Sequence, residues 1–235
     1  MPKHKEKNTN TNALLFIAFW VSVITECVAL YKKQYIVYSF SRVWVVPVLL
    51  TSILLSPVVK KVSFYSYAGL FCSLFADIFT IFGNDDIAYI GLSLYTASYL
   101  VFGCYFQQMK RNHNYSHIVF IVALLLLAAV NCLWLFVPNL RNETYYMQLA
   151  LHSGILVFAV YTILDAKKRV NHPAIGLFLI AVGFMVITNV LYGLDLLYFH
   201  RKYAIMDSLV GLGDGVYLFL ATKAVVSISK AGLNG

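Results

Sequence analysis

The sequence predicts an all-α membrane protein, a polytopic bundle of eight transmembrane helices. Of its 235 residues, 60% are hydrophobic and only 12% are charged, whereas a soluble domain carries about 25% charged residues. The mean hydropathy is +0.75. A water-soluble core of this size cannot hide so much apolar surface, which excludes a soluble enzyme. Runs such as VALLLLAAV at 122–130 lack the alternation of a barrel strand and therefore favour helices.

Eight apolar stretches approach or exceed the roughly 20 residues that a helix needs to cross a bilayer. The polar segment 1–12, with its lysines, is expected to be a disordered basic tail. The stretch that follows it also suits a signal peptide, but its length of roughly 19 residues and the absence of an A-x-A site favour a retained helix. The spans are expected at approximately 13–31, 35–56, 62–83, 87–107, 117–138, 147–164, 174–198 and 203–228.

Short polar segments join these spans, so residues 13–228 are expected to form one membrane domain, followed by a short tail at 229–235. Cytoplasmic loops carry an excess of Lys and Arg. If the N-terminus is cytoplasmic, the inside segments hold 11 of these residues and the outside segments 5. This excess predicts that both termini are cytoplasmic. The expected location is the plasma membrane in a bacterium or the endoplasmic reticulum in a eukaryote.

Composition gives no sign of a cofactor, a metal or a nucleic-acid partner. The net charge of +8 is not gathered into basic clusters with interleaved aromatic residues, as nucleic-acid binding requires. The four cysteines lie inside apolar stretches without a CxxC pair, which is typical of packing residues. A glycine-rich phosphate loop is also missing from the sequence. Lipids are therefore the expected partners.

Polar side chains inside the spans are the candidate functional residues, because a charge in hydrocarbon costs roughly 2.5–3.5 kcal/mol. With the predicted topology, one such cation lies toward the cytoplasm, Lys223, and is expected to reach the interface. The others fall in the outer half of the membrane, which predicts one polar pocket open to the non-cytoplasmic side. They are Glu26, Arg42, Asp77, His152, Asn189, Asp195, Asp207 and Asp214.

Several of these residues also have a purely structural interpretation. Carboxylates near the ends of spans reach the interface readily, and this is expected of Glu26, Asp195 and Asp207. Arg42 suits a structural pair with one carboxylate, and His152 suits a satisfied histidine of the bundle.

Asp77 and Asp214 are the deepest carboxylates, and for them a functional role is favoured. Gly69 and Ser73 precede Asp77 at intervals of four residues and share its helix face. Small residues at this spacing let helices approach closely or leave room for a ligand.

Four segments are similar to elements of one membrane-protein family. The segment 68–77 (AGLFCSLFAD) resembles the element G-L-x-F-S-x-x-G-D, and the segment 91–99 (GLSLYTASY) resembles G-L-x-x-F-x-x-A-H-x-x-Y. The segment 181–189 (AVGFMVITN) stands where the family has G-x-x-x-F-x-x-S-D, and 35–47 stands where a helix leads into a proline. These elements are those of the YhhN-like family, which includes the lysoplasmalogenases. The resemblance covers nearly the whole chain and implies the same eight-span plan.

The sequence departs from the family at several polar positions. Ser98 stands where the family has a histidine, and Asn189 stands where it has its second aspartate, with Asp195 six residues further on. The family's Tyr-x-x-Ala-Gln element is replaced by a region containing Asp214 and Tyr217. Of the family's polar centre, only Asp77 carries over.

The resemblance implies hydrolysis of the vinyl ether bond of lysoplasmalogens to a fatty aldehyde and a glycerophospho-alcohol. That reaction needs an acid to protonate the alkene and a water to trap the cation, a division of work that carboxyl pairs perform in glycosidases. Asp77 is the expected acid, and Asp214 or Asp195 is the expected second carboxylate. Arg42 or His152 is expected to hold the head-group phosphate. The remaining expected substrate-binding residues are Ser73, Ser98, Asn189 and Tyr217.

The alternative is a non-enzymatic, divergent member of the family that acts as a transporter or a lipid-binding protein. Transporters also place acidic residues at mid-membrane between repeated sets of helices. The weak similarity of segments 69–77 and 181–189 fits such a repeat. A retinal protein using Lys223 is disfavoured by the eight spans and by the nine-residue separation from Asp214.

Overall fold

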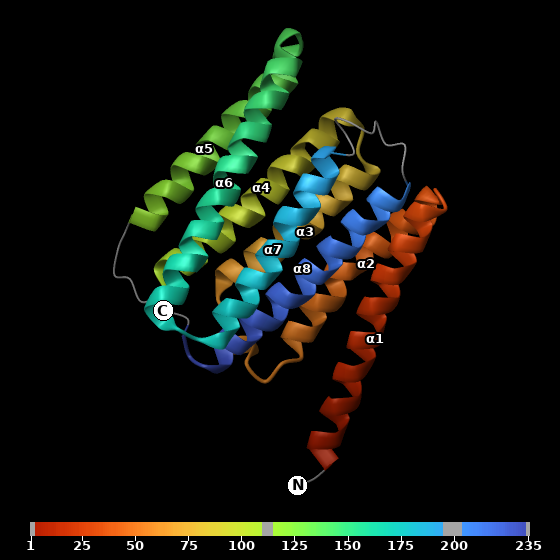
Figure 1. Ribbon diagram of the computed structural model, residues 1–235, viewed down its shortest axis with the longest axis vertical. Helices are drawn as coiled ribbons and strands as arrows, with labels where there is room; N and C mark the ends of the chain where they lie inside the picture. The colour runs from red at the N-terminus through yellow and green to blue at the C-terminus, as the bar shows by residue number, and fades with distance from the viewer. Residues whose placement is uncertain (1–2, 110–114, 195–203, 234–235) are drawn as a thin grey trace. The chain divides into compact units, whose positions relative to one another are not determined.

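The chain folds into long helices throughout the part that the computed structural model describes, residues 3–109, 115–194 and 204–233. Within these ranges there are eight α-helices and no strand (Figure 1). All eight are long and apolar enough to cross a membrane. The predicted all-α, eight-span architecture is confirmed.

The observed helices lie close to the predicted spans, with two extensions. Two short 3₁₀ helices, η1 (Val59–Lys61) and η2 (Pro138–Leu140), precede α3 and α6. The α-helices are α1 Lys3–Tyr31, α2 Tyr35–Leu54, α3 Phe64–Phe82, α4 Asp85–Gln108, α5 Tyr115–Phe136, α6 Arg141–Val170, α7 Pro173–Leu194 and α8 Ala204–Lys230.

The extended helices are α1 and α6, whose polar flanks are helical as well. Residues predicted as a disordered tail belong to α1, which begins at Lys3, although its apolar part begins at Thr11. Helix α6 begins six residues before its predicted span. A helix lengthens by adding one hydrogen bond per residue once it is nucleated, so an apolar span can carry polar turns at its ends.

Local sequence explains where several helices end. The side chains of Ser63 and Asn84 accept hydrogen bonds from the first backbone N–H groups of α3 and α4, as N-cap residues do. Asn171 ends α6 in a left-handed conformation with φ of 43°, which asparagine tolerates better than most residues. Pro173 then begins α7, a position where its missing N–H costs nothing.

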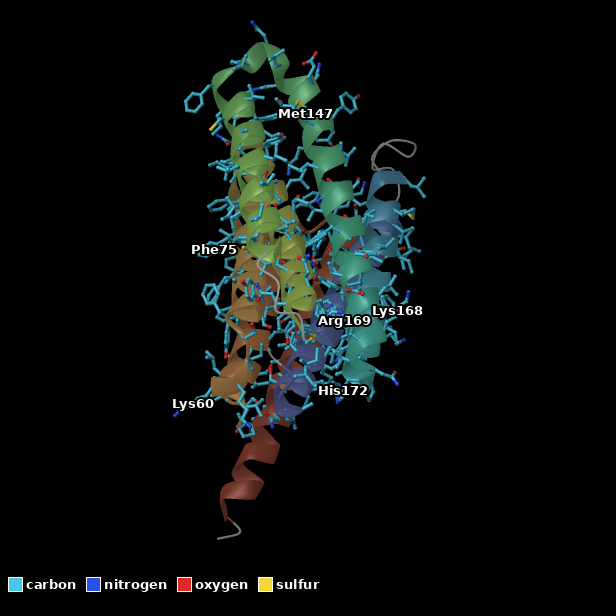
Figure 2. The ribbon with its side chains drawn as sticks, turned by 90° about the vertical axis from the view of Figure 1, so that its left-hand side faces the viewer. Lys60, Phe75, Met147, Lys168, Arg169 and His172 are labelled. Atoms are coloured by element: carbon cyan, nitrogen blue, oxygen red, sulfur yellow. The ribbon has the colours of Figure 1, made fainter. Side chains whose placement is uncertain are left out.

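The helices fall into two compact units. Unit 1 comprises residues 1–60 and 180–226, and unit 2 comprises residues 61–179 and 227–235. In unit 1, α1 packs along α2; in unit 2, α4 packs against α3, α5 and α6. Helix α4 has the largest buried share of the eight spans. Side chains such as Phe75 on α3 are exposed and project outward, as expected for a surface that faces lipid (Figure 2).

An arginine at the end of α6 fixes the end of α4. Arg169 (Figure 2) donates from Nη1 to the carbonyl of Met109 and from Nη2 to that of Phe106, at 3.2 Å for the second bond. Its Nε donates to Asp165 at 3.1 Å. The last carbonyls of a helix have no partner within the helix, and a cation placed there also interacts favourably with the helix dipole. Arg169 therefore satisfies two backbone carbonyl groups at the end of α4.

Close packing of α3 on α4 depends on Gly69. A Cβ atom at this position would lie 2.7 Å from Cε2 of Phe102. The Phe102 ring is buried and packs against the ring of Phe178, with 5.3 Å between their centroids. The ring therefore has little freedom to move away.

We expect Gly69→Ala to lower the free energy of unfolding by about 1–3 kcal/mol, the usual cost of overpacking. Gly154→Ala on α6 is the matched control, because a Cβ there meets nothing within 4 Å. That variant should be neutral or slightly stabilising, since alanine favours helix over glycine. Thermal unfolding of the two variants in detergent measures the difference, and equal midpoints would contradict the packing described.

Candidate functional site

Two clusters of polar side chains lie inside the described spans, one in each unit. The arginine cluster of unit 1 consists of Glu26, Arg42, Thr188 and Asp214. The aspartate–histidine cluster of unit 2 is built on α4 and consists of Asp77, Tyr95, Thr96, Tyr99, Gln148 and His152.

Arg42 on α2 binds carboxylates from two other helices. Its Nη1 lies 3.1 Å from Oε1 of Glu26 on α1, and its Nη2 lies 3.3 Å from Oδ2 of Asp214 on α8. The side chains of Glu26 and Arg42 are 1% and 6% exposed, whereas that of Asp214 is 29% exposed. Glu26 therefore acts as a buried anchor for the guanidinium, and Asp214 is the carboxylate that remains accessible.

This arrangement corrects two interpretations drawn from the sequence. Glu26 does not reach out to the interface but is buried against Arg42. Arg42 pairs with two carboxylates and not with a single one. A charge buried in an apolar bundle is costly unless it is paired. The three helices are therefore oriented so that these groups face one another.

Residues of α7 and α8 complete the arginine cluster. Thr188 donates a hydrogen bond from its hydroxyl to Oδ1 of Asp214 at 3.0 Å. A Cβ on Gly213 would lie 2.1 Å from Cγ2 of Thr188, and one on Gly211 would lie 3.0 Å from Oε1 of Glu26. Neighbouring side chains thus occupy the space beside Gly211 and Gly213 where a Cβ atom would lie. Their small size lets α8 approach the groups that hold Asp214.

Asp77 is the central acid of unit 2. It lies on α3, is only 1% exposed, and accepts a hydrogen bond from the hydroxyl of Tyr95 on α4. The hydroxyls of Ser73 and Ser98 are 3.0 Å apart, and both contact the carbonyl of Gly69, at 3.1 and 2.9 Å. These two serines, which are predicted to bind substrate, contact each other and join α3 to α4.

His152 on α6 is oriented by Thr96 of α4. Its Nδ1 lies 2.9 Å from the Thr96 hydroxyl, which also contacts the carbonyl of Leu92 at 2.9 Å and the amide nitrogen of Gln148 at 3.3 Å. The carbonyl can only accept, and a hydroxyl has one hydrogen to give. All three contacts are satisfied if Thr96 donates to Leu92 while Nδ1–H and the Gln148 amide donate to Thr96. In a neutral ring, this assignment places the lone pair on Nε2.

Asp77 and His152 are each bonded to a residue of α4. Tyr95 and Tyr99 are one turn apart on this helix, and Tyr99 packs edge-on against the His152 ring with 5.3 Å between centroids. Tyr95 binds Asp77, while Thr96 binds His152. An acid and an imidazole are therefore held by adjacent residues of one rigid helix.

The other predicted residues are placed as follows. Asn189 donates to the carbonyl of Met185 at 2.9 Å, Tyr217 is 5% exposed, and Asp207 is half-buried in the first turn of α8. Asp195 lies outside the described residues. The expected convergence of Asp77 with Asp214 concerns both units and stays a prediction.

Sequence reasoning did not single out the partners that hold the acids. For Tyr95 the sequence carries one indication, because the family element has phenylalanine at this position. The additional hydroxyl of Tyr95 binds Asp77. Thr96, Gln148 and Thr188 gave no signal, because single hydroxyl and amide residues in helices usually bond to their own backbone.

We expect Arg42→Gln to lower the free energy of unfolding by about 3–5 kcal/mol, because it leaves the carboxylate of Glu26 buried without compensation. The double variant Glu26→Gln/Arg42→Gln should recover most of this loss, since both charges are then removed. Thermal unfolding of the single and double variants tests this. A single variant as stable as the wild type would show that the buried pair is not required for folding.

Comparison with known proteins supports the resemblance seen in the motifs. A model of the YhhN family matches residues 37–212. No curated protein and no solved structure matched the chain. The matched region contains Arg42 and all residues of the aspartate–histidine cluster, whereas Glu26 and Asp214 lie outside it. Since this region spans most of the sequence, the chain belongs to the YhhN family.

Proposed function

We propose that the protein is a membrane hydrolase of the lysoplasmalogenase type, which cleaves the vinyl ether bond of a lysoplasmalogen. The observation that carries the proposal is Asp77, a carboxyl group buried in an apolar span, bonded to Tyr95, in the motif that this family shares. The products are a fatty aldehyde and a glycerophospho-alcohol. Membership of a family that includes lysoplasmalogenases supports the substrate class.

In the proposed reaction, Asp77 donates its proton to the alkene carbon that is not bonded to the ether oxygen. The electron pair of the double bond forms the new C–H bond, and the ether oxygen shares the resulting positive charge. Water then adds to the cationic carbon and loses a proton, and the hemiacetal that forms breaks into aldehyde and alcohol. Tyr95 assists because its hydroxyl hydrogen bond is stronger to the carboxylate left after proton transfer than to the neutral acid.

Asp214 is the proposed second carboxylate, as the sequence suggested, and Asp195 is the alternative at this role. Within the arginine cluster, Asp214 suits this role better than Glu26, because Asp214 keeps part of its surface exposed whereas Glu26 is buried against Arg42. A carboxylate of this kind stabilises the cation electrostatically. Arg42 is less suited to bind the phosphate of the substrate, because its guanidinium already serves two carboxylates.

His152 is the proposed acceptor of the proton that the attacking water releases. With Nδ1–H directed to Thr96, Nε2 is the nitrogen with a lone pair, which suits a base better than a phosphate ligand. As the hemiacetal breaks down, the imidazolium gives this proton to the leaving alcohol oxygen, and the hemiacetal hydroxyl gives its proton to the Asp77 carboxylate, which restores the acid.

We expect Asp77→Asn to reduce aldehyde release from a lysoplasmalogen by at least a hundredfold, because an amide cannot supply the proton. Tyr95→Phe should retain partial activity, since it removes only the supporting hydrogen bond. An enzyme-coupled aldehyde assay on purified protein in detergent measures both, with Gly154→Ala as the folded control. Wild-type protein that releases no aldehyde would contradict the proposal.

We expect His152→Asn to retain the fold and to lose most activity, because the asparagine amide can still donate to Thr96 but offers no basic nitrogen. The pH profile of the residual rate distinguishes this from a structural effect. Removal of a base abolishes the fall in rate at low pH, whereas a packing defect lowers the rate equally at every pH. The second result would assign His152 a structural role.

Coupled transport is the second candidate, and the arginine cluster favours it. Transporters hold their coupling ions at carboxylates between helices, and Glu26 and Asp214 share one arginine among α1, α2 and α8. If the protein releases no aldehyde, uptake into liposomes that depends on a proton gradient and is lost in Asp214→Asn would establish this function instead.

A further inference from the structure

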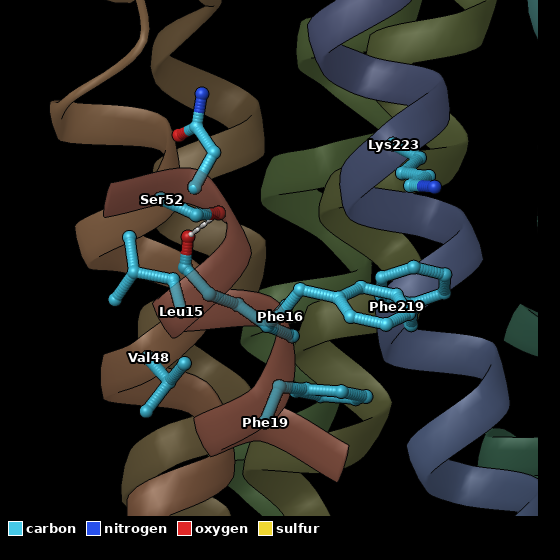
Figure 3. Close-up of a pocket in the computed structure, with 9 residues that line it drawn as sticks. Leu15, Phe16, Phe19, Val48, Ser52, Phe219 and Lys223 are labelled. Carbon is cyan, nitrogen blue, oxygen red and sulfur yellow. Dashed lines mark hydrogen bonds between the residues drawn. The ribbon is translucent and has the colours of Figure 1, made fainter. Parts of the chain in front are cut away.

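Unit 1 contains an apolar pocket at the end of its helices opposite to the arginine cluster (Figure 3). The pocket has a volume of about 150 Å³ and lies among α1, α2 and α8. Its walls include Phe16 and Phe19 from α1, Val48 from α2 and Phe219 from α8, with Lys223 among the lining residues. The rings of Phe16 and Phe219 meet edge to face, with 5.7 Å between their centroids.

On α1 and α2, the pocket lies near one boundary of the apolar spans. Its α1 residues belong to the first turns of the apolar span, which begins at Thr11, and its α2 residues belong to the last turns before Leu54. Lys223 is nine residues beyond Asp214 on α8, about 14 Å along the helix axis. The charge bias of the sequence predicts that this boundary faces the cytoplasm.

Lys223 is a cation without a carboxylate partner among the described residues. Its Nζ lies 4.6 Å from the centroid of the Phe219 ring and 6.0 Å from that of Phe16. Both distances suit a cation–π interaction, which attracts the ammonium group to the rings without neutralising its charge. The carboxylates of unit 1 whose side chains are described, Glu26, Asp207 and Asp214, all lie toward the other end of these helices.

A cation beside an apolar pocket, near the boundary of the spans, matches the two parts of a phospholipid. Basic pockets between transmembrane helices bind anionic head groups. A volume of about 150 Å³ is below the 300–1,000 Å³ of a typical ligand site, so the pocket fits a segment of one acyl chain and not a whole substrate molecule.

We propose that Lys223 and this pocket bind an anionic phospholipid of the surrounding bilayer, with its phosphate at Nζ and part of one acyl chain between Phe16, Phe19 and Val48. The site is distinct from the residues proposed for hydrolysis. It requires neither Asp77 nor the arginine cluster, and it goes beyond the proposed function.

The test measures which lipids stay with the protein. Purified protein is exchanged into nanodiscs with equal amounts of phosphatidylglycerol and phosphatidylcholine, released into mild detergent, and its bound lipids are counted by native mass spectrometry. We expect the wild type to retain about fivefold more phosphatidylglycerol than phosphatidylcholine, the ratio that corresponds to about 1 kcal/mol for one basic residue near an anionic surface. Lys223→Gln should bring the ratio close to one, and Lys223→Arg should preserve it.

Lys230→Gln is the matched control, because Lys230 is an exposed lysine at the end of the same helix and does not line the pocket. It should keep the wild-type ratio. Val48→Phe, which fills part of the pocket, should reduce retention of both lipids and leave their ratio unchanged. Inorganic phosphate at millimolar concentration should not displace the lipid.

Three results would overturn the proposal. Lys223→Gln with the wild-type ratio would show that this lysine does not select the lipid, and equal losses in Lys223→Gln and Lys230→Gln would show only general attraction to a basic surface. Displacement by inorganic phosphate would identify a simple anion site. Because lipid retention is the measurement, the result does not depend on whether the protein releases aldehyde.

Discussion

A polar group inside a membrane span must find its partner within the protein, and this constraint organises the structure. Lipid offers no hydrogen bonds, so an unpaired charge or carboxyl group there is costly. Glu26 and Asp214 meet this demand through Arg42, and Asp77 meets it through Tyr95. The contacts of Arg42 join α2 to α1 and to α8, and the contact of Tyr95 joins α4 to α3. The same bonds that make the acids tolerable in the membrane therefore also align the helices.

The two clusters pair their polar groups in different ways, and the difference affects the chemistry of each cluster. In unit 1 two carboxylates share the permanent positive charge of Arg42, an arrangement that suits electrostatic stabilisation. In unit 2 a phenol donates to Asp77, and a hydroxyl contacts His152. The proposed proton transfers accordingly use the unit 2 cluster, whereas Glu26 is committed to Arg42.

The sequence was sufficient to predict the fold but not the residues that bond to the candidate site residues. Long apolar runs without alternation determine helices in lipid, and α2 to α8 lie near their predicted positions for that reason. The polar start of α1 was missed because composition does not reveal how far a helix continues beyond its apolar part. Asp77 stood out through its motif. The burial of Glu26 and the bond to Tyr95 depend on how neighbouring helices are rotated, which spacing within one helix does not specify.

The position of Arg169 has a consequence for how this protein acquires its orientation. Basic residues beside a span are ordinarily regarded as topogenic signals, interchangeable with any other lysine or arginine nearby. Arg169 belongs to such a group with Lys167 and Lys168, yet it alone caps the carbonyl end of α4. Neutralising its two neighbours would weaken only the signal for insertion. Relocating Arg169 would also uncap a helix, so charge in the last turn of α6 can be redistributed more freely at Lys167 and Lys168 than at Arg169.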